Sequence, residues 1–243
     1  MSETLLVEEA AAGVLLLTLD RPAQRNAIDL DLCAALSGAL ARFRDEERWR
    51  AAILTGRPPA FCAGLDLKSF AAPDAPRHHV TELIHSVAAL GKPIIAAVNG
   101  AAYTGGLELA LACDFILASE EARFADTHAK IGALSGSGMG SRLPHAVGQR
   151  FAKQMMFSCQ PIDAPTALRV GLVNELLPAD RLLPRAIELA AAAAGHDPAL
   201  VRIVKDVLDR GGAATLAEAI GIEREALARR KAEGAMRWEA DRT

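Results

Sequence analysis

The alternation of short apolar runs with helical segments constrains the fold of this chain most. AAILTG at 51–56 and PIIAAVNG at 93–100 have the length and the bounding glycines of buried strands. Helices are expected at 30–47 and 78–90, and VLLLTL is expected to form a hairpin with residues 5–8. Because this order of strand, strand and helix recurs before residue 150, the sequence predicts an α/β fold with a layered core.

The pattern changes beyond about residue 150, where it becomes almost wholly helical apart from the short run VNELL. Helices are expected at 180–194, 198–210 and 215–239. No low-complexity linker separates this part from the rest of the chain. We therefore expect a core that spans 1–180 and a C-terminal helical region that spans 181–243.

Charge and cysteine usage exclude several classes of partner. The formal net charge of −3 gives no reason to expect nucleic acid or an anionic membrane. The start of the chain is acidic where a secretory signal is basic, and no apolar run is long enough to cross a bilayer. The four cysteines form no C-x-x-C pair, and the six histidines show no metal-binding spacing. We expect a cytoplasmic protein with reduced cysteines and no metal site.

The segment NGAAYTGGLELALACD at 99–114 places a carboxylate inside an apolar helix. Most glutamates lie on the solvated face of a helix. The neighbours of Glu108 are Leu107 and Leu109, followed by alanines and Leu111, and they leave hardly any polar face. The position of Glu108 therefore needs an explanation other than solubility.

Two glycine-containing loops carry backbone groups that suit an anion. A strand that runs into Gly-Gly and then a helix leaves unpaired N–H groups at the start of the helix, and Gly105 is the first of them. FCAGLD forms a second turn, in which Leu65 offers another N–H. Two converging donors form an oxyanion hole. On spacing alone, the simpler interpretation is that these glycines only make turns.

Several motifs in the same order resemble the enoyl-CoA hydratase/isomerase (crotonase) superfamily. They are RPAQRNAID, AFCAGLDL, NGAAYTGGLELALACD, ARFADTHAKIGALSGSGMGSRLPHAVG and DAPTALRVGLVNELLP, and together they cover nearly the whole chain. The resemblance implies a spiral of repeated ββα units, followed by a C-terminal helical region that builds a homotrimer or a hexamer of two trimers. It also implies an acyl-CoA thioester as substrate, with no cofactor besides the CoA that the substrate carries.

The same resemblance assigns roles to four residues. The N–H groups of Leu65 and Gly105 would hold the thioester oxygen as it becomes an enolate, and Glu108 would help to activate water. His128 stands where the hydratases have a second glutamate, which departs from the family pattern. Imidazole acts as acid or base near neutral pH, so His128 either supplies a proton or merely lines the pocket. Thr104 replaces a glycine that the family often has before this Gly-Gly pair.

The resemblance also implies where CoA binds. Arg25 and Lys68 match positions where the family often has basic residues beside the nucleotide end of CoA. Backbone groups in the same two loops would contact the adenine and the pantetheine arm. The candidate ligand-binding residues are Arg25, Ala27, Ala63, Asp66, Leu67, Lys68 and Gly106.

These assignments imply a lyase of fatty-acid or related acyl-CoA metabolism that hydrates a 2-enoyl-CoA. Two alternatives remain open. One is double-bond isomerisation or another enolate reaction, in which one acid/base group moves a proton. The other is a non-catalytic acyl-CoA binder that has lost its second acid/base group.

Overall fold

The computed structural model describes residues 4–72 and 74–234. The chain forms two compact units, Met1–Gly195 and His196–Thr243. A six-stranded sheet organises the first unit, with the strand order β1-β2-β3-β5-β7-β10. Its strands are β1 (Leu5–Ala11), β2 (Val14–Leu19), β3 (Ala51–Gly56), β5 (Ile94–Val98), β7 (Phe115–Ser119) and β10 (Glu175–Leu177).

The pairing of these strands explains their apolar sequences. Strands β1 and β2 form the predicted antiparallel hairpin, and every other neighbouring pair is parallel. Parallel strands are usually covered on both faces, so their sequences are continuous apolar runs rather than alternating ones. All six residues of β3 are buried, and so are all five of β5. The predicted α/β layered core is confirmed.

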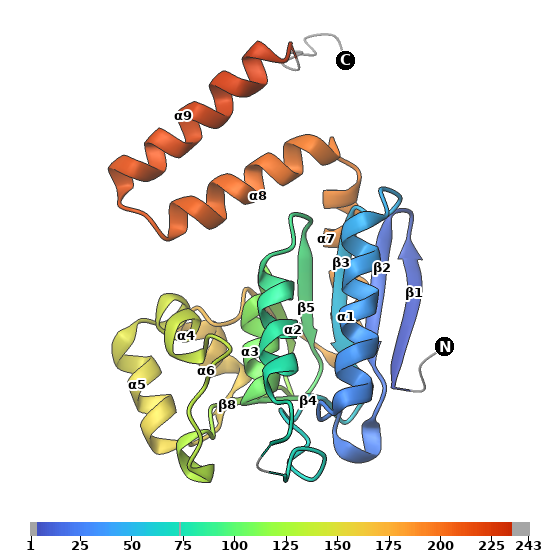
Figure 1. Cartoon of the computed structure of the whole chain (residues 1–243), viewed down its shortest axis with the longest axis vertical. Helices are drawn as coiled ribbons and strands as arrows, with labels where there is room; N and C mark the ends of the chain where they lie inside the picture. The colour runs from blue at the N-terminus through green and yellow to red at the C-terminus, as the bar shows by residue number, and fades with distance from the viewer. Residues whose placement is uncertain (1–3, 73, 235–243) are drawn as a thin grey trace. The chain divides into compact units, whose positions relative to one another are not determined.

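Helices cover both faces of this sheet. Leu17 and Leu54 belong to the core between the sheet and one layer of helices, whereas Leu16 and Ile53 belong to the core on the opposite face. Figure 1 shows helices in front of the sheet and behind it. Those in front are α1 (Leu30–Asp45), α2 (His78–Ala88) and α3 (Gly105–Ala112), and the one behind is α7 (Ala179–Ala194).

The first unit extends beyond the boundary predicted at 180, because it includes the helix α7. Its residues Leu182, Ala186 and Ala190 are spaced four apart and pack on the sheet beside Ile53 and Ile95. Because this helix completes the second face of the sheet, it belongs to the first unit. The division lies after Gly195 instead.

A second, four-stranded sheet was not predicted. Its order is β4-β6-β8-β9, and consecutive strands such as β3 and β4, or β5 and β6, lie in different sheets. The chain therefore turns from the large sheet into the small one before α2 and again before α3, which gives the predicted ββα repeat. Its strands are β4 (Ala60–Cys62), β6 (Ala101–Tyr103), β8 (Arg123–Ala125) and β9 (Ile162–Asp163). The remaining helices of this unit are α4 (Met139–Val147), α5 (Gln149–Ser158) and α6 (Ala164–Arg169), with short 3-10 turns at Pro22–Gln24 and Ala129–Ile131.

The second unit is a pair of helices, α8 (Pro198–Gly212) and α9 (Leu216–Ala232). The Asp197 side chain caps the start of α8, and Thr215 with Glu218 forms a capping box at the start of α9. The predicted helix at 215–239 thus begins as expected, although residues 235–239 lie outside the described part of the chain. In the regions that the structure describes, no helix combines the length and the apolar character needed to span a bilayer.

A buried lysine ties α1 to the strand that follows α2. Lys92 is 4% exposed, and its Nζ donates to the carbonyl oxygens of Phe43 at 2.8 Å and Glu46 at 3.0 Å. An ammonium group at a helix C-terminus satisfies orphan carbonyls and opposes the helix dipole.

We expect Lys92→Met to lower the free energy of unfolding by about 2 kcal/mol, because hydrogen bonds from a charged donor are lost in a buried place. Urea denaturation measures the change, with the exposed Lys153→Met as the matched control. Equal stability of the two variants would show that Lys92 does not anchor the end of α1.

Candidate active site

Two loops that are distant in sequence meet beside the small sheet. The backbone N–H of Ile28 donates to the Gly64 carbonyl at 2.7 Å, and the Asp66 N–H donates to the Ile28 carbonyl at 2.9 Å. The Ala63 N–H donates to the carbonyl of Arg25 at 3.0 Å. The first predicted motif therefore holds the second in place through an isolated parallel β-bridge between Ile28 and Leu65.

Arg21 and Asn26 anchor this junction, and the sequence did not single them out. The Arg21 guanidinium pairs with Asp29 at 2.7 Å and with Asp66 at 3.1 Å. The fully buried Asn26 amide donates to the carbonyls of Arg57 and Ala60 at 2.8 and 2.7 Å. These bonds satisfy buried polar groups that would otherwise be costly. The signal available in the sequence was only a polar loop next to a proline.

The two predicted oxyanion donors lie next to one another. The Leu65 backbone nitrogen is 3.6 Å from the position that a Cβ on Gly105 would occupy, and the Gly105 nitrogen is 3.2 Å from that of a Cβ on Gly64. Neither N–H donates to another group in the described part of the chain. Gly105 is the first residue of α3, so its N–H has no partner within the helix.

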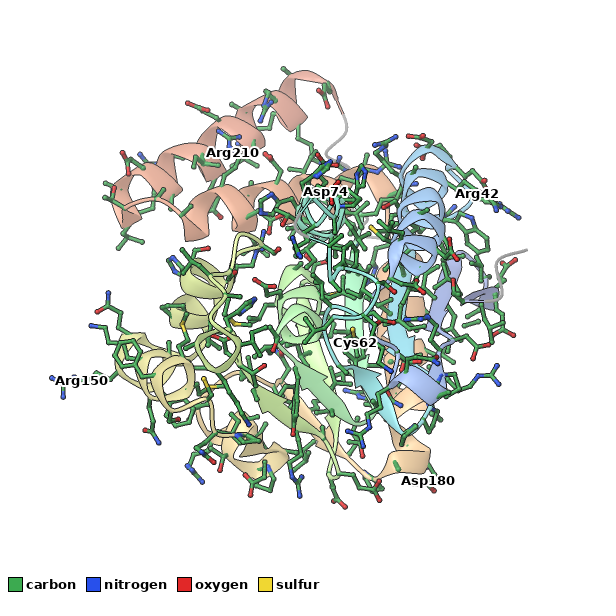
Figure 2. All side chains as sticks on the ribbon, turned by 60° about the horizontal axis from the view of Figure 1, so that its bottom comes forward. Arg42, Cys62, Asp74, Arg150, Asp180 and Arg210 are labelled. Atoms are coloured by element: carbon green, nitrogen blue, oxygen red, sulfur yellow. The ribbon has the colours of Figure 1, made fainter. Side chains whose placement is uncertain are left out.

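Gly106 brings α3 into direct contact with β4. A Cβ at this position would overlap the backbone carbonyl of Cys62, so only glycine allows this approach. Figure 2 labels Cys62 among the side chains that fill the centre of the view. Complete burial raises the pKa of its thiol to about 12, which leaves it unreactive. Gly106 has a packing role, and contact with CoA stays a prediction for it.

Thr104 takes the left-handed conformation that a glycine would adopt more easily, with φ at 51°. Its hydroxyl lies 2.5 Å from that of Thr127. Its backbone N–H donates to the Ala125 carbonyl at 2.8 Å. These bonds hold the turn before α3 in place although a glycine is missing there.

Glu108 is 3% exposed and lies in the first turn of α3, as its apolar flanks predict. One carboxylate oxygen, Oε1, accepts a short hydrogen bond from the Ser135 hydroxyl and a second from the Met139 N–H at 3.3 Å. The other oxygen, Oε2, lies 4.0 Å from Nε2 of His128. One oxygen is therefore fixed, and the other faces the imidazole. Ser135 could not be recognised from the sequence, because only the folded loop brings it to α3.

His128 lies between two carboxylates. Its Nδ1 is 2.6 Å from Oδ1 of Asp126, and its Nε2 faces Glu108. The hydrogen bond to Asp126 raises the pKa of His128, and burial lowers it. The charges of Asp126 and Glu108 add to the increase, so the pKa lies above its ordinary value.

Glu108 and His128 share one cavity of about 240 Å³. Glu108, His128 and Leu65 line it together with Thr104. Apolar side chains that also line it, Leu67, Ile131 and Leu134, are 59%, 48% and 93% exposed. A larger hollow of about 520 Å³ between α1 and α2 contains none of the candidate catalytic residues. The smaller cavity is the candidate active site because it contains the acid/base groups.

Apart from Gly106, the candidate CoA-binding residues lie in the two joined loops. Arg25 and Lys68 are exposed there, and Ala27 and Ala63 are less exposed. Asp66 has a structural partner, because its carboxylate pairs with Arg21 and accepts from the backbone of Lys68 at 3.2 Å. Contact with CoA stays a prediction for all of these residues.

Comparisons with known proteins point to one family. Residues 9–238 match the sequence model of the family described as enoyl-CoA hydratase/isomerase. A probable enoyl-CoA hydratase of Rhizobium meliloti is 37% identical over 225 residues, which are 91% of this chain and 87% of the relative. The 2,3-dehydroadipyl-CoA hydratase of Escherichia coli is 36% identical over 228 residues, 93% and 89% of the two chains.

Solved structures show the same fold. The crystal structure of an enoyl-CoA hydratase from Bacillus anthracis superposes with a TM-score of 0.89. That protein is 34% identical, and the match covers 93% of this chain and 90% of the other.

Proposed function

The chain belongs to the enoyl-CoA hydratase/isomerase family, and we propose that it adds water to the double bond of a 2-enoyl-CoA thioester. Hydratase-like function is supported by relatives of that name that match nearly the whole chain. The observation that carries the proposal is the 4.0 Å separation between Glu108 Oε2 and His128 Nε2, beside two unpaired amides. At that separation one water oxygen can contact both atoms at about 2.8 Å.

The proposed reaction uses four groups. The N–H groups of Leu65 and Gly105 receive the thioester oxygen. Glu108 takes a proton from water as the water oxygen forms a bond to C3, and the π electrons of the double bond move to the oxygen as an enolate. The imidazolium of His128 then gives a proton to C2, and the enolate electrons form the new C–H bond. Transfer of a proton from Glu108 to His128 restores the enzyme.

The cavity and its rim accommodate the rest of the substrate in this proposal. The exposed apolar side chains of Leu67, Ile131 and Leu134 offer surface to the acyl chain or the pantetheine arm. Arg25 and Lys68 face the phosphates of CoA. The helices α8 and α9 assemble copies into a homotrimer or hexamer, since Leu200, Val204 and Leu208 are exposed along α8.

Purified protein given crotonyl-CoA, longer 2-enoyl-CoAs and 3-enoyl-CoAs tests the activity. Loss of the conjugated thioester absorbance on water addition is the expected result. Turnover of 3-enoyl substrates alone would instead identify an isomerase. Tight binding of CoA esters without turnover would identify a non-catalytic binder, and either outcome contradicts the proposal.

We expect His128→Ala to lower kcat for hydration about 100-fold, because the proton for C2 loses its donor. The exposed His145→Ala on α4 is the matched control and should keep the full rate. If the two variants hydrate crotonyl-CoA equally fast, His128 only lines the pocket.

A further inference from the structure

Asp126 is a buried carboxylate whose described partners all belong to one residue. It follows β8 and is 1% exposed, and a buried charge is stable only when it is paired. Its Oδ1 accepts from the backbone N–H of His128 at 3.2 Å and contacts Nδ1 of the same residue at 2.6 Å. The carboxylate therefore fixes both the loop and the ring of His128.

This contact decides which ring nitrogen can exchange a proton with the cavity. A carboxylate only accepts, so Nδ1 carries a hydrogen toward Asp126. Nε2 is left facing Oε2 of Glu108 at 4.0 Å, inside the cavity. The two nitrogens of an imidazole differ in just this way when one is held by a hydrogen bond.

We propose that Asp126 is a positioning residue that holds the His128 imidazole with Nε2 toward the substrate, where Nε2 delivers the proton. The inference rests on the proposed hydratase function. In this inference two residues replace the second glutamate. The imidazole contacts the substrate, and the carboxylate orients the imidazole. A carboxylate that orients an imidazole in this way also stabilises the imidazolium.

The charges around His128 support this role. Asp126 faces it from its own segment, Glu108 faces it from α3, and Arg77 at the start of α2 lines the same cavity. The two carboxylates keep the pKa of His128 above its ordinary value, against the effect of burial. The imidazolium consequently persists to higher pH than in a free histidine, and hydration continues there.

The test is Asp126→Asn. An asparagine keeps an oxygen for the backbone N–H of His128 but lacks the charge. We expect kcat to fall about tenfold with KM unchanged, and the alkaline limb of the kcat–pH profile to move to lower pH. The direction follows because removal of a negative charge makes the imidazolium less stable. The exposed Asp180→Asn, which Figure 2 shows at the edge of the molecule, is the matched control.

A titration by NMR separates this inference from the proposed activity. In protein labelled at histidine 13Cε1, the pKa of His128 should fall in Asp126→Asn whatever reaction is catalysed. An unchanged pKa would overturn the inference even if crotonyl-CoA is hydrated. A lowered pKa without any hydration would overturn the proposed function and leave the pair intact.

A double-mutant cycle covers the case in which Asp126→Asn is poorly stable. If Asp126 acts through His128, the same substitution in a His128→Ala background should leave the remaining rate unchanged. A fall by the same factor in both backgrounds would show a merely structural role. Thermal unfolding of each variant gives the folded fraction with which the rates are corrected.

Discussion

Replacement of Glu108 by glutamine is expected to lower kcat for crotonyl-CoA hydration about 10³- to 10⁴-fold, the upper part of the range for a general base. The amide has the same shape, and its oxygen can still accept from the Ser135 hydroxyl and the Met139 N–H. It cannot take the proton that water loses as it attacks C3. Steady-state rates at several substrate concentrations measure the loss.

Binding distinguishes a lost base from a damaged site. Because the amides at Leu65 and Gly105 are untouched, the Kd for an unreactive acyl-CoA should stay within about threefold of the unchanged protein. The exposed Glu120→Gln is the matched control and should keep its rate. If Glu108→Gln retained a tenth or more of the activity, Glu108 would not be the general base of the reaction.

Gly106→Ala is expected to have the largest effect on stability. The new methyl group would overlap the Cys62 carbonyl, which is backbone and cannot rotate away. Either α3 or β4 must move, and overpacking of this kind costs about 3 kcal/mol or more. A shift of α3 would also displace the Gly105 amide and Glu108, so activity should fall with stability.

Gly140→Ala provides the control, because that glycine lies in α4 with nothing within 4 Å of the added Cβ. Alanine favours a helix by roughly 1 kcal/mol over glycine, so this variant should be as stable as the parent or more so. Thermal and urea unfolding of both variants measures the difference. Equal stability of the two would mean that α3 and β4 are not in close contact at Gly106.

The central strands of the large sheet could be predicted because they are buried on both faces. AAILTG corresponds residue for residue to β3, because a short continuous apolar run that ends at a glycine is typical of a buried strand. The helices α1 and α2 end two residues earlier than predicted. Ends of helices depend on local capping more than on periodicity.

The small sheet could not be predicted in the same way. Its strands have two or three residues each, too few for a periodic pattern to appear. Their pairing depends on the path of the whole chain. The division after Gly195 differs from the boundary expected at 180 for a related reason, because only the sheet shows that α7 has a surface to cover.

The site shows the same contrast between local and long-range information. Glu108 was noticeable from its neighbours alone, and the family resemblance pointed to His128. Ser135 was missed because its bond to Glu108 joins residues 27 positions apart. Asp126 precedes His128 by two residues in DTH. Its role depends on its burial, which cannot be read from the sequence. Asp66 was assigned to ligand binding, and its ion pair with Arg21 appears only in the fold.

A crystal structure of Glu108→Gln with bound crotonyl-CoA tests the oxyanion hole directly. The thioester oxygen should lie about 2.7–3.1 Å from both the Leu65 and the Gly105 nitrogen atoms, with C3 facing the side chain at 108. A thioester that contacts neither amide, or that occupies the hollow between α1 and α2, would contradict the account.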